Sequence, residues 1–177
     1  MKKYIGLVLV AMSGCILTVN AQQSFSYKNP LLPTELRVND LLGRMTLEEK
    51  IAQIRHLHSW DVFDGQILNQ EKLDKMCGGI GYGFFEGFPL TAASCRKTFR
   101  EIQTYMVEKT RLGIPGFPVA ESLHGVVHEG TTIYPQNIAM GSTFNPELAY
   151  EKTKHIAGEL NTMGVKQVLA PCIDVVR

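Results

Sequence analysis

The sequence carries almost no net charge, because its 18 lysine and arginine residues nearly balance its 17 aspartate and glutamate residues. It has neither a basic excess nor a run of like charges, so we expect no nucleic acid and no anionic surface as a partner. Hydrophobic residues make up 45% of the chain, which is an ordinary share for a globular protein.

Cysteine is scarce, and its spacing excludes two roles. Beyond the first 21 residues only Cys77, Cys95 and Cys172 remain, an odd number without a C-x-x-C pair. We therefore expect neither a disulfide framework nor a thiolate zinc site. Cys95 falls on the apolar face of a predicted helix and Cys172 in an apolar run. Both are predicted to be small buried hydrophobic residues.

The sequence also lacks the usual motifs of metal and phosphate sites. His124 and His128 stand four residues apart, but no glutamate follows the first histidine as the H-E-x-x-H zinc motif requires. We assign no metal ligands and expect no cofactor. The glycines of residues 78–85 do not match G-x-G-x-x-G, and we expect them to allow close packing of a strand. His56 and His58 are interpreted as surface residues.

The first 21 residues have the pattern of a secretory signal peptide. Lys2 and Lys3 give a positive start, residues 5–12 form an apolar core, and Ala21 ends a small-residue cleavage pattern. We therefore expect an exported protein, either periplasmic or secreted. The apolar core is too short to cross a bilayer, so we expect no membrane span. Two alternatives stay open, which are a lipoprotein anchored through Cys15 and a buried N-terminal helix.

The next part of the chain is predicted to be a lead-in followed by two helices. Residues 22–33 are polar with two prolines and are predicted to be extended. Apolar spacing predicts a first helix at residues 36–45. Thr46 and Glu49 fit a capping box that begins a second helix. The buried face of this second helix is expected to contain Leu47, Ile51, Ile54 and Leu57.

Strand and helix patterns then alternate, which predicts an α/β fold with a parallel sheet. A surface loop is expected at residues 60–64 and a polar connection at residues 130–137. On sequence pattern alone, a barrel and a doubly wound sheet both stay open. The predicted strands are residues 78–85, 117–120 and 165–176, and the predicted helices are residues 68–76, 91–109 and 145–163.

Polar residues directly follow the strand predicted at residues 117–120. Glu121, Ser122 and His124 lie between that apolar run and Gly125. In sheets built from strand and helix repeats, ligands bind at the carboxyl ends of the strands. We therefore take this segment as the candidate site, with a water-exposed loop carboxylate as the alternative interpretation of Glu121.

Four sequence blocks resemble those of a known enzyme family. They are residues 37–53, 112–125, 134–145 and 169–177, and the second contains L-G-I-P and E-S-L-H-G. In this order they resemble the N-terminal domain of glycoside hydrolase family 3, the family of β-glucosidases and β-xylosidases. The resemblance implies a (β/α)8 TIM barrel with residues 34–177 as its N-terminal part. Only the first strands and helices are expected here, because eight repeats typically need about 250 residues.

Together with the predicted signal peptide, the resemblance implies an exported retaining exo-β-glycosidase that hydrolyses β-glucosides or β-xylosides. It implies that Glu121 accepts hydrogen bonds from sugar hydroxyls and that His124 either orients Glu121 or satisfies loop carbonyls. The nucleophile and the acid/base are expected beyond Arg177, so no catalytic residue is assigned and the chain alone is expected to be inactive. Many glucose-cleaving relatives have aspartate at the position of Glu121, and the longer glutamate slightly favours pentosides without excluding glucosides.

Two other functions are weighed beside this one. The first is a carbohydrate-binding or envelope interaction protein without catalysis. The second is a metal-dependent hydrolase that uses His124 and His128, which the H-E-x-x-H argument disfavours. The expected partner is a β-linked oligosaccharide or glycoside.

Overall fold

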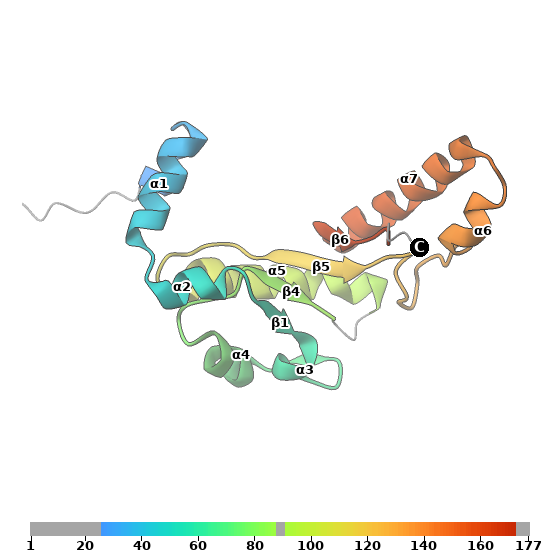
Figure 1. Ribbon diagram of the computed structural model, residues 1–177. Coiled ribbons are helices and arrows are strands. Elements are labelled where there is room, and N and C mark those ends of the chain that lie inside the picture. Colours follow the sequence, from blue (N-terminus) through green and yellow to red (C-terminus); the bar gives the residue numbers. More distant parts are fainter. Residues whose placement is uncertain (1–25, 88–90, 173–177) are drawn as a thin grey trace, which may run out of the picture. The chain divides into compact units, whose positions relative to one another are not determined.

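The computed structural model describes residues 26–87 and 91–172 (Figure 1). These residues fall into two compact units that divide between Gly43 and Arg44. The predicted signal peptide lies outside the described residues. In the first unit, α1 (Thr34–Arg44) confirms the first predicted helix, and η1 (Ser26–Lys28) replaces part of the predicted extended lead-in. The backbone N–H of Tyr27 donates to Asp40 Oδ2 at 3.0 Å, which closes this turn against α1.

The second unit is built around a parallel sheet of four strands in the order β1-β4-β5-β6. These strands neighbour one another in chain order, as in a (β/α)8 barrel, whereas doubly wound sheets reverse their order. The chain therefore forms the first four strands of a TIM barrel, and the predicted α/β class is confirmed. The strands are β1 (His56–His58), β4 (Phe84–Glu86), β5 (Phe117–Glu121) and β6 (Gln167–Leu169).

The strand register separates two faces of this sheet. Leu57 and Phe85 pair with each other and belong to the buried core, which also contains residues of α5 (Ala92–Lys109) and α7 (Pro146–Met163). Successive strand residues point to opposite faces, so His56, its partner Phe84 and Phe117 lie on the other face. In a barrel the helices cover the outside, and this second face lines the interior.

The sequence prediction missed the first strand of the sheet. β1 precedes the strand predicted at residues 78–85, and that prediction was too long because β4 begins only at Phe84. Gly78 caps α4 (Gln70–Cys77) with a φ of 53°, so a turn occupies the start of the predicted strand. Close packing is confirmed at Gly83, where a Cβ would lie 1.8 Å from the carbonyl oxygen of Gln53.

The loop predicted at residues 60–64 is also wrong. This segment contains α3 (Ser59–Val62) and β2 (Phe63–Asp64), which pairs with β3 (Ile67–Leu68) in an antiparallel hairpin. Val62 and Phe63 are buried in the core. Packing in the core therefore fixes the side chains of Val62 and Phe63.

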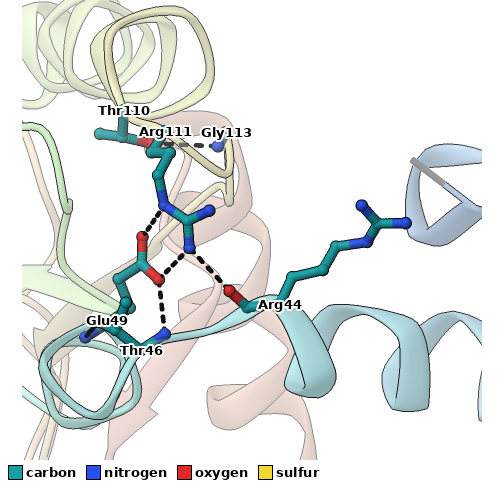
Figure 2. A network of polar contacts seen from close by, with 6 residues as sticks. All are labelled: Arg44, Thr46, Glu49, Thr110, Arg111 and Gly113. Carbon is teal, nitrogen blue, oxygen red and sulfur yellow. Dashed lines mark hydrogen bonds and ion pairs between the residues drawn. The ribbon is translucent and has the colours of Figure 1, made fainter. Parts of the chain in front are cut away.

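The capping box at the start of α2 (Leu47–Ala52) is confirmed, but its predicted buried face is wrong. Ile54 is 77% exposed, and Leu47 and Ile51 are exposed too. The helix buries Glu49 instead, because Arg111 donates to both carboxylate oxygens, Nε at 2.8 Å and Nη2 at 2.5 Å (Figure 2). Of the four predicted apolar positions only Leu57 is buried, and it belongs to β1.

The other three predicted helices are confirmed. The helix predicted at residues 68–76 is α4, with Asn69 as its N-cap. Thr91 caps α5, whose Cys95, Phe99, Ile102 and Met106 are buried as predicted. α7 begins after Asn145 and ends at Gly164, which has a φ of 94°. Of the helices within the described ranges, none combines the length and apolarity needed to cross a membrane.

The last part of the chain differs from its prediction in three ways. α6 (Asn137–Gly141) begins where the predicted polar connection ends. β6 is only three residues long, whereas a strand was predicted at residues 165–176, of which 173–176 lie outside the described residues. Cys172 is exposed and not buried, because β6 ends at Leu169, three residues before it.

Candidate functional site

A cavity of about 400 Å³ lies where three neighbouring strands end. Its lining includes His58 at the end of β1, Glu86 at the end of β4 and Glu121 at the end of β5, together with Trp60. Its volume falls in the range of small-molecule sites, roughly 300–1,000 Å³. The carboxyl ends of barrel strands are also where active sites lie in this fold. The apolar part of the lining includes Cys95, Phe99, Val119, Val126, Met163 and Val165.

Glu121 is the last residue of β5 and lines this cavity. It shares a sheet face with Phe117, four residues earlier, and therefore belongs to the face that lines a barrel interior. Its side chain is exposed, and it makes no hydrogen bond or ion pair with residues 26–87 or 91–172. A carboxylate in this position is available to a ligand.

The loop after Glu121 depends on Gly125. Gly125 has a φ of 113°, and a Cβ there would lie 2.4 Å from the carbonyl oxygen of Thr132. Two hydrogen bonds hold Thr132 to α7. The Thr132 hydroxyl donates to Glu159 at 2.6 Å, and the Thr132 backbone N–H donates to Glu159 at 3.2 Å. The E-S-L-H-G motif therefore ends in a residue that the fold requires to be glycine.

His124 does not line the cavity around Glu121. Its backbone carbonyl accepts from the N–H of Tyr134 at 2.8 Å. Its ring Nδ1 is buried and has no hydrogen-bond partner in the part of the chain that the structure describes. Neither predicted role of this imidazole, orienting Glu121 or satisfying loop carbonyls, is represented by a hydrogen bond here, and its role stays a prediction.

Two histidines of β1 meet one carboxylate of β4. The Nδ1 atoms of His56 and His58 lie 3.0 Å and 3.3 Å from Oε1 of Glu86. The two histidines share a face because they are two residues apart in a strand, and the register places His58 opposite Glu86. Their interpretation as surface residues is wrong, since both side chains are partly buried and face the Glu86 carboxylate. Neither Nδ1 makes a hydrogen bond with the residues that the structure describes. The alternating pattern of residues 56–58 was the signal that could have revealed them.

Trp60 completes this side of the cavity. Its ring stacks on His58 with a centroid distance of 4.4 Å and an interplanar angle of 7°. It is nevertheless 69% exposed. Among the described residues, no group of three or more His, Cys, Asp or Glu is arranged to hold a metal ion. The chemistry that this cavity offers is hydrogen bonding by carboxylates beside an open aromatic ring.

Comparisons with family models and with characterised proteins both find glycoside hydrolases. The model of the glycosyl hydrolase family 3 N-terminal domain matches residues 46–177. A candidate β-xylosidase of Formosa agariphila is 31% identical over 160 residues, covering 88% of this chain and 21% of the relative. A periplasmic β-glucosidase of Salmonella typhimurium is 27% identical over 177 residues, covering 99% of this chain and 21% of that protein.

A solved structure shares the fold. The β-glucosidase of Erythrobacter marinus superimposes with a TM-score of 0.71 and 27% identity over 87% of this chain and 20% of its own. The chain thus spans about a fifth of the length of these relatives. Its family match covers the sheet, the cavity and the E-S-L-H-G loop together, and the chain belongs to glycoside hydrolase family 3.

Proposed function

We propose that this chain forms the first part of the catalytic barrel of an exported retaining exo-β-glycosidase, in which Glu121 binds the nonreducing sugar. The observation that carries the proposal is the position of Glu121, whose carboxylate ends β5 in the cavity without a partner among the described residues. A charged acceptor suits sugar hydroxyls because its hydrogen bonds are shorter and stronger than neutral ones. Its two oxygens can hold two neighbouring hydroxyls at once.

The chain by itself is proposed to bind sugar without cleaving it. Retaining hydrolysis needs a nucleophile and an acid/base about 5 Å apart. Resemblance to the family assigns both roles to positions beyond Arg177. The purified chain should therefore show no turnover of aryl β-xylosides or aryl β-glucosides, and turnover would contradict this division of roles.

Pentosides are the proposed preference. Glutamate is one methylene longer than the aspartate of many glucose-cleaving relatives, and its carboxylate would reach toward the hydroxymethyl group of a hexose. The names of two relatives support xylosides and glucosides as the substrate classes, because one is a candidate β-xylosidase and the other a β-glucosidase. Methyl β-xyloside should therefore bind more tightly than methyl β-glucoside.

Export is proposed from the first 21 residues, which have the composition of a signal peptide. The name of the Salmonella relative, a periplasmic β-glucosidase, supports the same compartment. Anchoring through Cys15 is the alternative that the same residues allow.

The test is sugar binding by the 177-residue chain and by Glu121→Gln. Gln keeps the shape but removes the charge, so we expect affinity for methyl β-xyloside to fall about tenfold or more, as for the loss of one charged hydrogen bond. The matched control is Glu129→Gln, because Glu129 is exposed in the same loop region and does not line the cavity. Calorimetry measures the affinity, and circular dichroism checks that each variant is folded. Equal affinity of Glu121→Gln and Glu129→Gln for methyl β-xyloside would contradict the proposal.

A further inference from the structure

One buried residue of α7 differs from the apolar face on which it lies. The buried residues of this helix are Lys152, Ile156, Leu160 and Met163, and Lys152 is the only polar one among them. It is 8% exposed. Burial of an ammonium group is costly unless the group is hydrogen-bonded, so a lysine at this position needs specific acceptors.

The ammonium group of Lys152 finds its acceptors in the segment that leads into α6. Its Nζ donates to the carbonyl oxygen of Pro135 at 3.1 Å and to Oδ1 of Asn137, the first residue of α6, at 2.8 Å. Both acceptors are neutral, and no carboxylate in the described part of the chain forms an ion pair with Lys152. This side chain therefore fastens Pro135 and Asn137 to α7.

The same segment is fastened to α7 at a second point. Glu159 accepts from the hydroxyl of Thr132 at 2.6 Å and from its backbone N–H at 3.2 Å. Residues i and i+7 share a helix face, so Lys152 and Glu159 make their contacts from one side of α7. Residues 132–137 are therefore held by α7 at both ends.

This segment supports the loop that follows Glu121. The backbone N–H of Tyr134 donates to the carbonyl oxygen of His124 at 2.8 Å. Pro135 follows Tyr134 directly, so Lys152 holds the residue next to this hydrogen bond. A shift of the segment would move His124 and, through the short loop between them, Glu121.

We infer that Lys152 is a positioning residue for sugar binding, which acts through the loop after Glu121 without touching the ligand. Lys152 does not line the cavity at Glu121. By holding residues 132–137 on α7, it fixes the direction of the Glu121 carboxylate. Hydrogen bonds weaken steeply when their geometry is poor, so a small shift of this carboxylate lowers affinity for sugar. The inference rests on the proposed function of Glu121.

The test is a double-mutant cycle on the 177-residue chain, with methyl β-xyloside as the ligand and calorimetry as the measurement. Lys152→Met removes the donors but keeps an unbranched side chain, and it should lower the affinity about fivefold, as for coupled residues of one network. In the Glu121→Gln background the same substitution should change the affinity little, because the charged acceptor that Lys152 positions is already gone. Lys152→Arg keeps a cationic donor and should restore most of the affinity.

The matched control is Lys154→Met, because Lys154 lies on the same helix but is exposed, with its Nζ 3.4 Å from Glu151. It should leave the affinity unchanged in both backgrounds. A merely structural role of Lys152 predicts that Lys152→Met weakens binding by the same factor with and without Glu121. That result, or equal affinities of Lys152→Met and Lys154→Met, would overturn the inference.

A second pair of variants tests the same contact if Lys152→Met does not fold. Asn137→Asp keeps the acceptor and gives the ammonium group a carboxylate partner, whereas Asn137→Ala removes the acceptor. Asn137→Ala should weaken binding of methyl β-xyloside about threefold, as for one lost hydrogen bond. Asn137→Asp should bind as well as wild type, and equal affinities of the two variants would contradict the role of Lys152.

Failure of the proposed function looks different from failure of this inference. If Glu121→Gln binds methyl β-xyloside as well as wild type does, or if the folded chain binds no sugar, the role of Glu121 falls and that of Lys152 falls with it. If Glu121→Gln weakens binding but Lys152→Met does not, only the role of Lys152 is lost.

Discussion

Arg111 holds Glu49 from across 62 positions of the sequence. Its Nε donates to Glu49 Oε1 at 2.8 Å and its Nη2 to Oε2 at 2.5 Å, while Nη2 also donates to the carbonyl oxygen of Arg44 (Figure 2). Glu49 in turn accepts from the backbone N–H of Thr46 at 2.8 Å. One buried carboxylate thus joins the start of α2 to the segment that leads into β5, the strand that carries Glu121.

Removal of Arg111 should therefore destabilise the whole unit. Arg111→Met leaves the Glu49 carboxylate, which is 4% exposed, without its cationic partner. We expect the free energy of unfolding to fall by roughly 2–3 kcal/mol, as for a buried charge that loses charged hydrogen bonds. Urea denaturation measures the change. Arg96→Met on the exposed side of α5 is the control and should change stability little.

The same pair predicts how stability depends on pH. Hydrogen bonds from Arg111 hold the pKa of Glu49 below its ordinary value of 4.5. The unfolded chain then binds more protons than the folded chain as the pH falls past that value. The stabilisation is complete above the ordinary pKa and is lost as the pH falls through the lowered folded pKa.

Urea denaturation between about pH 6 and pH 3 should show this loss. Glu49→Gln should have a shallower decline, because it lacks the titrating group. Some slope should persist in that variant, since hydrogen bonds from Asn69 and Lys72 also lower the pKa of Asp64. Identical slopes in wild type and Glu49→Gln would contradict the assignment.

Gly125 should tolerate no side chain. Gly125→Ala places a Cβ 2.4 Å from the carbonyl oxygen of Thr132 on a backbone with a φ of 113°. We expect a loss of about 1–3 kcal/mol in stability from strain at this position, together with weaker sugar binding, because the loop after Glu121 must shift.

A second glycine gives the matched comparison for that variant. Gly158 lies inside α7, where a Cβ would meet nothing within 4 Å. Gly158→Ala should raise stability by about 0.5–1 kcal/mol, because alanine favours the helix. Thermal unfolding and calorimetry of the two variants test both statements, and a stable Gly125→Ala with normal sugar affinity would refute the first.

Export can be tested on the N-terminus. When the gene is expressed in a Gram-negative bacterium, the mature protein in the periplasmic fraction should begin at Gln22, as mass spectrometry would show. A protein that begins at Cys15 and takes up labelled palmitate would establish the lipoprotein alternative. An uncleaved N-terminus in the cytoplasm would rule out both.

Local signals in the sequence predicted the elements whose ends are chemically marked. Thr46 with Glu49, Asn145 with Pro146, and Gly164 each fix a helix end by hydrogen bonds or by backbone conformation within a few residues. The position of Glu121 at the end of β5 was predictable in the same way, because an apolar run stops directly before it.

Other features could not be predicted because they depend on contacts distant in sequence. The pattern at residues 47–54 indicated an apolar helix face, yet the helix buries Glu49, since Arg111 arrives from beyond α5. β1 has only three residues, two of them histidines, and its pairing with β4 decides that it is a strand at all.

The sequence by itself determined the family, the alternation of helices and strands, and the carboxylate at the end of β5, because motifs, caps and apolar runs act over short distances along the chain. Only the tertiary structure decided that His56 and His58 share Glu86 and that Trp60 stands in one cavity with Glu121. Parallel strands are joined by long crossovers, and the register between them is set by packing of the sheet against its helices, which local sequence does not encode.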